Sequence, residues 1–129
     1  EESITMKPNG LPSAERLRSL TAIRRLFTDG DAGFAYPFRY IVYVEQGAPS
    51  VEVLCSVPKR YHKRANRRNV LRRRTKEAYR LHKQSLQERA AERGISMDVA
   101  FIYSSKEVLP YKTIENAVER VLAELLSRY

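Results

Sequence analysis

Apolar residues recur along the chain at two different spacings, and these spacings predict its helices and strands. Between Leu17 and Phe27 they follow the period of an α-helix, with Ser19 or Thr21 as the N-cap and Gly30 beyond its end. The last stretch of the chain repeats this period behind Pro110, which suits a first helical turn. Its apolar stripe consists of Ile114, Val118, Val121, Leu122, Leu125 and Leu126.

The segments between these helices are rich in β-branched and aromatic residues, as strands are. Residues 38–44 and 51–57 flank the turn residues 46–50, so we expect them to form an antiparallel pair. Residues 98–103 predict a further strand, and residues 29–36 have room for one more short strand.

A basic segment follows the second strand and leads into a long helix that we expect to end near Gly94. The order is therefore helix, strands, helix, strand, helix, which predicts an α/β sandwich with helices packed on a sheet. With 129 residues, 43% of them hydrophobic, the chain has the size and composition of one domain. We place that domain at residues 13–129 and expect residues 1–12 to be a flexible lead-in.

The cysteine content and the hydropathy of the chain indicate in which cellular compartment the protein functions. The single cysteine, Cys55, supports neither a disulfide framework nor a cysteine zinc site, and we expect it to be a small packing residue. No apolar run approaches the roughly 20 residues that span a membrane. A cytoplasmic protein is the expectation.

Positive charge is concentrated between Lys59 and Lys83. This segment carries twelve lysines and arginines and one acid, Glu77, so its formal charge is +11 while the whole chain carries +9. Such a block repels itself in water and is stabilised by a polyanion that releases its counterions. Nucleic acid is the predicted partner.

Helical spacing divides the basic segment into two faces. Asn69, Arg73, Lys76, Arg80 and Lys83 share one side with Arg72 adjacent, and the other side can pack on a sheet. That inner side consists of Leu71, Thr75, Ala78, His82 and Leu86, flanked by Tyr79. A merely solvated helix alternates its charges, and here only Glu77 can pair, so the arginine-rich face is predicted to grip phosphates.

RNA suits this pattern better than DNA. The chain lacks zinc-finger spacings and leucine heptads, while aromatic residues on a sheet can stack on unpaired bases. Core packing is the competing interpretation for each aromatic, since the pattern does not show which sheet face the helices cover. The candidates are Phe38, Tyr40, Tyr43, Phe101 and Tyr103.

We expect no catalytic residue in the protein itself. His62 and His82 are the only histidines, and each is interpreted as structural or as an RNA contact. Asp29 and Asp31 flank Gly30, as residues of a polar turn do. A self-sufficient nuclease would need an acidic or histidine cluster, and the sequence has none in evidence.

The order of the basic residues resembles the signature of the bacterial ribonuclease P protein component. The resemblance extends to the first helix from Glu15 to Gly30, the strand 98–103 and the amphipathic last helix. Val70 stands where that signature usually has arginine, and Pro58 where serine is common, but Arg67, Arg72, Arg73 and Arg74 oversupply charge. The matching segments are Ser56–Arg60, Arg64–Ala65, Arg68–Asn69, Leu71–Arg73 and Lys76–Arg80.

The resemblance implies an α+β fold, a two-layer α/β sandwich like a ribosomal protein domain, with a left-handed βαβ crossover. It implies the protein subunit of a ribonucleoprotein whose RNA removes the 5′ leader of precursor tRNA, with Mg²⁺ bound mainly by that RNA. Its partners would be the catalytic RNA and precursor tRNA, with no membrane and no obligate protein partner. The implied RNA-binding residues are Lys59, Arg60, Lys63, Arg64, Arg67, Arg68, Asn69, Arg72, Arg73, Lys76 and Arg80. A cleft between the sheet and the first helix would receive the leader, with Phe27, Phe38 and Tyr40 as candidates.

One alternative remains open at the level of sequence. A ribosomal or ribosome-assembly protein of similar fold would carry the same basic charge without any catalytic association. The RNA that co-purifies with the protein distinguishes the two.

Overall fold

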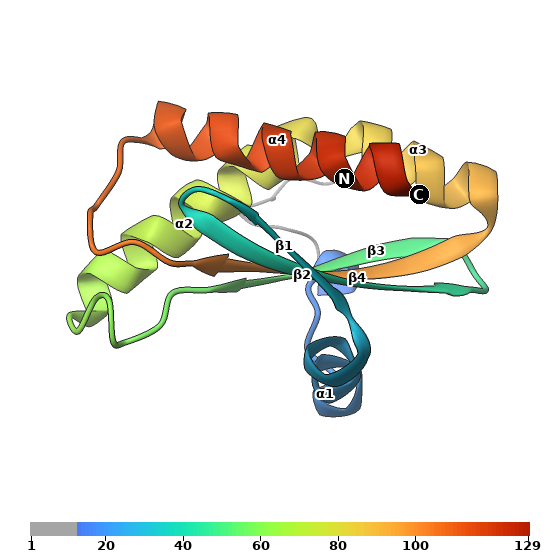
Figure 1. Ribbon diagram of the computed structural model, residues 1–129, viewed down its shortest axis with the longest axis horizontal. Helices are drawn as coiled ribbons and strands as arrows, with labels where there is room; N and C mark the ends of the chain where they lie inside the picture. Colours follow the sequence, from blue (N-terminus) through green and yellow to red (C-terminus); the bar gives the residue numbers. More distant parts are fainter. Residues whose placement is uncertain (1–12) are drawn as a thin grey trace.

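Within residues 13–129, four strands form one sheet, three α-helices cover one of its faces, and a fourth lies on the other (Figure 1). The computed structural model describes residues 13–129, so the predicted lead-in at residues 1–12 lies outside the described residues. The elements in chain order are η1 (Ser13–Glu15), α1 (Leu20–Asp29), β1 (Asp31–Ala35), β2 (Phe38–Gln46), β3 (Ser50–Ser56), α2 (Ala65–His82), α3 (Gln84–Arg93), β4 (Ile95–Tyr103) and α4 (Tyr111–Arg128).

The strands lie in the order β1-β2-β4-β3. β2 is antiparallel to both β1 and β4, whereas β3 runs parallel to β4 and is joined to it through α2 and α3. The predicted pairing of residues 38–44 with 51–57 is therefore wrong, because β4 lies between them. β4 is buried along nearly its whole length, which suits an inner strand of a sheet. The connection from β2 to β3 crosses the start of β4, where the Gly47 amide donates to the Gly94 carbonyl at 3.1 Å.

Alternation along the strands sends side chains to two separate cores. The main core lies between the sheet and α2, α3 and α4, and contains Phe38, Tyr40, Val99 and Phe101. A smaller core around Leu26 and the β2, β4 residues Ile41, Ala100 and Ile102 lies under α1. The α+β class and the helix-on-sheet sandwich predicted from the sequence are confirmed, and α1 adds cover on the opposite face (Figure 1).

Local signals predicted α1 and β1, but α1 begins at Leu20 and not at Leu17, whose amide donates to the Val53 carbonyl at 2.9 Å. Ser19 caps α1, since its hydroxyl accepts from the Ala22 amide at 3.2 Å, and Gly30 follows the last turn and donates to the Leu26 carbonyl. The short strand expected within residues 29–36 is β1.

The long helix expected to end near Gly94 is two helices that meet at Lys83. The Lys83 carbonyl accepts from the Leu86 and Gln87 amides, both at 3.1 Å, so the hydrogen-bond ladder restarts there. The Lys83 ammonium binds the Glu15 carboxylate at 2.7 Å, which ties η1 to the break. Beyond the break Leu86 and Ala90 are buried. Gly94 ends α3 in the left-handed conformation (φ 62°), which glycine adopts most readily.

Candidate nucleic-acid interface

A tight loop between β3 and α2 carries the first basic residues. The Pro58 carbonyl accepts from the amides of Tyr61 and His62 at 3.2 and 3.3 Å. The His62 ring is buried, and its Nε2 donates to the Ser105 carbonyl at 2.7 Å. Arg68 then donates to the carbonyls of His62 and Lys63 at 3.0 and 2.7 Å. The loop is thus fixed from inside, while its cations, Lys59, Arg60, Lys63 and Arg64, are exposed.

The helix α2 presents its two faces as the sequence predicts. Leu71, Thr75, Ala78 and Tyr79 are buried, and the Thr75 hydroxyl donates back to the Leu71 carbonyl at 2.8 Å. On the outer side Arg67, Asn69 and Arg73 are exposed, and Arg68, Arg72, Lys76 and Arg80 are partly buried. We call the outer side of α2 together with the loop 59–64 the basic surface.

The two edges of the basic surface meet different neighbours. Toward β3, burial raises the pKa of the Cys55 thiol to about 12, and the nearby charges of Lys76 and Arg72 offset part of that rise. Toward α4, the Arg74 guanidinium donates to the Leu109 carbonyl at 2.6 Å. Arg74 therefore serves the fold, although the sequence groups it with the surplus charge.

Few of these cations are neutralised by the protein. Glu77 binds Arg80 through both oxygens, at 2.9 and 2.7 Å, and this hydrogen bonding raises the pKa of Arg80. Lys83, which the sequence places on the exposed face, is held by Glu15 instead. Within residues 13–129, no carboxylate forms an ion pair with the other cations of the surface. These are Lys59, Arg60, Lys63, Arg64, Arg67, Arg68, Arg72, Arg73 and Lys76.

Two of the three aromatic candidates for leader contact lie in the core. Phe38 is fully buried and Tyr40 is 2% exposed, because their face of β2 packs under α4. The Tyr40 hydroxyl donates to Glu124 of α4. Phe101 and Tyr103 are buried on the same face. The prediction of a nucleic-acid contact is therefore wrong for these four residues, and core packing is their role.

The sheet face beside α1 has its own aromatic and basic residues. Phe27 on α1 is 49% exposed, in keeping with a surface role, and Phe34 on β1 is 58% exposed. Phe34 pairs in register with Arg39, which is also exposed, so the two share this face. The sequence did not point to either residue, because β1 is too short to establish alternation at Phe34, and the alternation of β2 does not show whether the face of Arg39 is covered.

Acidic and basic residues on that face anchor α1. Arg25 forms ion pairs with Glu45 at 3.3 Å and Asp98 at 3.6 Å, and its guanidinium lies 4.7 Å from the centre of the Tyr43 ring. Burial raises the pKa of Asp98, and Arg25 offsets part of that rise. Tyr43, the fifth aromatic candidate, is thus half-buried beneath Arg25.

The remaining polar groups are structural. His82 joins α2 to α4 through Glu115 at 2.8 Å, and this hydrogen bond lowers the pKa of Glu115. Asp31 accepts from the Tyr129 hydroxyl at 3.1 Å. Over the described part of the chain, no three histidine, cysteine or acidic side chains are grouped so as to hold a metal ion.

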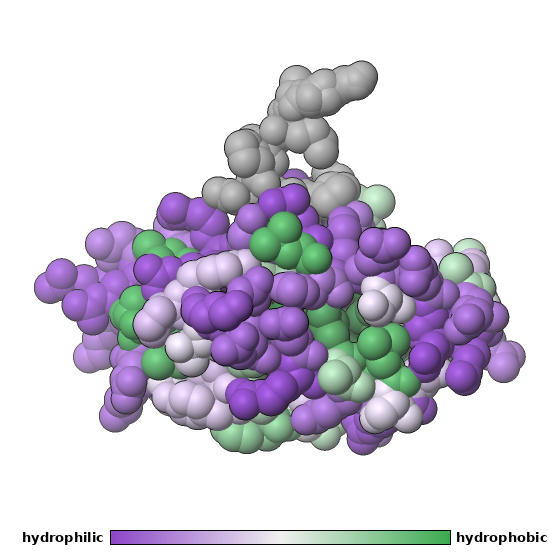
Figure 2. Space-filling model, turned by 90° about the horizontal axis from the view of Figure 1, so that it is seen from above, coloured by the Kyte–Doolittle hydropathy of each residue, from purple (hydrophilic) through white to green (hydrophobic). Residues whose placement is uncertain are grey.

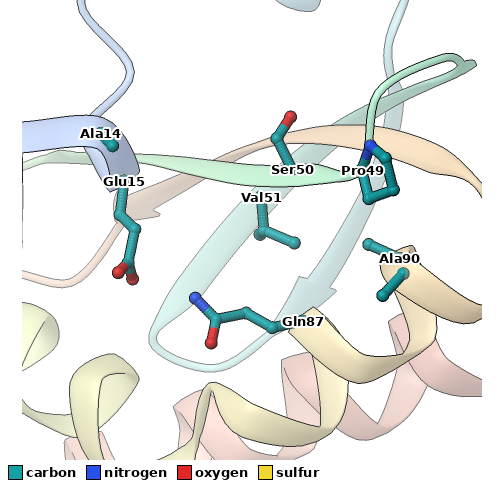
Figure 3. Close-up of a pocket in the computed structure, with 8 residues that line it drawn as sticks. Ala14, Glu15, Pro49, Ser50, Val51, Gln87 and Ala90 are labelled. Carbon is teal, nitrogen blue, oxygen red and sulfur yellow. The ribbon is translucent and has the colours of Figure 1, made fainter.

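The surface above the helices is largely hydrophilic, and its hydrophobic residues appear in separate groups (Figure 2). One cavity of about 290 Å³ lies between η1, the start of β3 and α3. In Figure 3 the Glu15 carboxylate and the Gln87 amide enclose it together with Val51 and Ala90. No basic residue lines it, so it is separate from the basic surface.

The fold and the basic surface define a class: a small α+β protein in which a densely cationic helix, α2, lies within the βαβ crossover from β3 to β4 and has few of its cations neutralised by the protein. The family model described as Ribonuclease P matches residues 11–126. The ribonuclease P protein component of Porphyromonas gingivalis is 35% identical over 118 residues, which cover 90% of this chain and 86% of that protein. The chain belongs to the ribonuclease P protein family.

Solved structures agree on the fold. The RNase P protein from Thermotoga maritima matches with a TM-score of 0.68 at 21% identity, covering 85% of this chain and 96% of that one. The protein from Staphylococcus aureus matches with a TM-score of 0.66 at 20% identity, covering 88% and 90%. Among the described residues, no helix is long and apolar enough to cross a membrane.

Proposed function

We propose that this chain is the protein subunit of ribonuclease P and assists removal of the 5′ leader from precursor tRNA. Membership of the family supports the assignment. The observation that carries it is the basic surface, where the only acid, Glu77, is already bound to Arg80. A surface so charged is stabilised when RNA phosphates replace its counterions.

The basic surface binds the catalytic RNA in this proposal. Exposed arginines such as Arg67 and Arg73 bind phosphate oxygens bidentately through their planar guanidinium groups. Because the loop from Lys59 to Arg64 is already fixed in the free protein, little conformational entropy is lost when it binds RNA. The chemistry belongs to the RNA, with Mg²⁺ held mainly by the RNA. The protein offsets phosphate repulsion where the two RNAs meet.

The leader lies across the α1 face in this proposal. Phe27 stays a candidate for stacking on unpaired bases, and Phe34 takes the place of the buried Phe38 and Tyr40. Arg39 beside Phe34 supplies a cation for the leader backbone. Contacts to a leader that the mature product lacks favour substrate over product.

Reconstitution tests the assignment. The protein is combined with a ribonuclease P RNA, and leader removal from precursor tRNA is assayed over a Mg²⁺ series. We expect the protein to lower the Mg²⁺ concentration that supports cleavage, and the protein without RNA to cut nothing. Cleavage by protein alone, or an unchanged Mg²⁺ requirement, would overturn the proposal.

A further inference from the structure

The cavity of about 290 Å³ between η1, the start of β3 and α3 has a mostly apolar wall. Val51 extends into it from β3 toward α3, where Ala90 lies, and both residues are almost fully buried (Figure 3). An engineered core cavity of about 150 Å³ already takes an apolar molecule the size of benzene. This cavity therefore has room for one large apolar side chain. Its apolar lining residues are Ala14, Pro49, Val51, Ala90 and Ala91.

The cavity carries no unpaired charge among the residues that the structure describes. Its one ionisable lining residue, Glu15, is bound by the Lys83 ammonium at 2.7 Å. The Gln87 side chain also faces the cavity, and its amide can both donate and accept a hydrogen bond (Figure 3). These groups suit a neutral apolar side chain whose backbone passes close to the amide.

The chain enters the described part of the molecule beside this cavity. Arg16 forms a parallel bridge with Val53. The Leu17 amide donates to the Val53 carbonyl at 2.9 Å, so this segment follows the outer edge of β3 in the same direction. The residues that precede it therefore lie toward the start of β3, and one of them, Ala14, lines the cavity.

The cavity lies at the open part of an edge strand. Among residues 13–129, the outer edge of β3 is paired only through the bridge at Val53. The start of the strand, at Ser50 and Val51, has β4 on one side and no strand on the other. An open strand edge beside an apolar hollow is a place where a further segment of chain can pack.

Leu11 is the first large apolar residue that precedes the described part of the chain. It comes three residues before Ala14, so the two Cα atoms lie at most about 11.4 Å apart. Pro12 follows it, and a residue before proline favours an extended backbone of the kind that lies beside a strand. The family match begins at residue 11, so Leu11 belongs to the matching domain.

Tethering favours this residue over a separate molecule. A short link between a group and its site gives an effective concentration that is roughly millimolar. A second copy of the chain, or a free apolar molecule, has to reach that concentration in solution to compete. At micromolar protein concentration the cavity is therefore filled from its own chain.

We propose that the segment before Ser13 packs along the start of β3, with the Leu11 side chain in the cavity. Leu11 then joins β3 to α3 through Val51 and Ala90, and its backbone covers the open strand edge. The lead-in expected from the sequence would end before Leu11. The inference concerns the packing of the domain and does not depend on the proposed function.

Methyl NMR spectroscopy of the full chain tests the contact directly. We expect nuclear Overhauser effects between the methyl groups of Leu11 and those of Val51 and Ala90. A sample that mixes labelled and unlabelled chains shows whether these contacts lie within one molecule. Absent contacts, or contacts between different molecules only, would overturn the proposal.

Paired substitutions measure how much the contact stabilises the fold. Leu11→Ala should raise the equilibrium constant for unfolding about tenfold or more, because it empties the cavity. Met6→Ala is the matched control, since it shortens another large apolar side chain of the same segment, and it should change that constant by less than about twofold. Equal effects of the two variants would overturn the assignment of Leu11. The contacts in the wild-type protein decide the question even if Leu11→Ala does not fold.

Discussion

Tyr40 on β2 lies opposite Gly33 on β1, and its ring occupies the space where a β-carbon at Gly33 would stand. The bare backbone of the glycine lets the Tyr40 hydroxyl reach Glu124 on α4. The Tyr129 hydroxyl at the end of α4 donates to Asp31 on the same edge strand at 3.1 Å. Two tyrosines thus tie β1, α4 and β2 together.

Replacing Gly33 with alanine should destabilise the fold. The added methyl group meets the Tyr40 ring, which cannot withdraw without breaking its bond to Glu124, and overpacking of this kind costs about 1–3 kcal/mol. Urea unfolding measures the loss. Ala32→Ser, at the exposed neighbouring position, is the control and should stay within about 0.5 kcal/mol of wild type. Equal midpoints for Gly33→Ala and the control would contradict the packing described.

Tyr40→Phe should flatten the loss of stability at alkaline pH. Burial and the hydrogen bond to Glu124 raise the pKa of Tyr40 to about 12 in the folded protein. The unfolded value is about 10, so the folded state holds this proton more tightly. The stabilisation is complete below pH ~10 and is lost as the pH rises toward the folded pKa. Unfolding free energies measured in this window should fall less steeply for Tyr40→Phe, and parallel curves would refute the prediction.

Replacing tyrosine with phenylalanine should affect stability differently at two positions where the hydroxyl is buried. The Tyr79 hydroxyl is buried and has no hydrogen-bond partner among the described residues, whereas the Tyr103 hydroxyl donates to the Glu107 carbonyl at 2.7 Å and accepts from the Leu109 amide at 3.2 Å. Tyr103→Phe should destabilise by about 1–3 kcal/mol, and Tyr79→Phe should leave stability unchanged or increase it. Chemical denaturation of both variants checks the pair, and the reverse order would be incompatible with these contacts.

His62→Ala should lower both stability and RNA affinity without changing the arginines and lysines around it. Removing the ring leaves the Ser105 carbonyl without its donor and frees the loop 59–64, at a cost of about 1–3 kcal/mol. Lys63→Ala is the matched control, because it removes an exposed charge from the same loop and should leave the unfolding midpoint unchanged. Filter binding with ribonuclease P RNA gives the affinities. A fully stable His62→Ala protein would show that the loop does not depend on this residue.

Arginines of the basic surface should set the salt dependence of RNA binding. Arg67 and Arg73 are exposed and have no carboxylate partner in the described residues, so each is available to a phosphate. Changing both to alanine should reduce the slope of log K against log salt by roughly 0.7–0.9 for each phosphate that is no longer neutralised. Arg93→Ala, on the exposed end of α3, should leave the slope unchanged. Indistinguishable slopes for the double variant and wild type would exclude this surface as the main RNA contact.

The sequence correctly predicted features that depend on residues close together in the chain, such as helix caps and the faces of a helix. Ser19 caps α1, and spacing alone separated buried Leu71 from exposed Arg73 on α2. Periodicity could not decide which face of β2 the helices cover, and so it placed Phe38 and Tyr40 on a surface. The predicted strand order was wrong for a related reason. β3 pairs with β4, a strand far along the chain that is buried on both faces, and not with its neighbour in sequence, β2. At the break, Lys83 binds Glu15, which lies 68 residues away in the sequence.

The contacts that anchor the basic loop come from residues that are synthesised after it. The loop and α2 are held by Ser105 and Leu109, and the sheet under them lacks the inner strand that joins β2 to β3 until β4 is made. On the ribosome, the polycation therefore emerges before the segments that give it shape. During that interval the nascent chain attracts RNA by charge alone. The contacts that hold the loop and α2 in place become available only when the chain has been extended through Leu109.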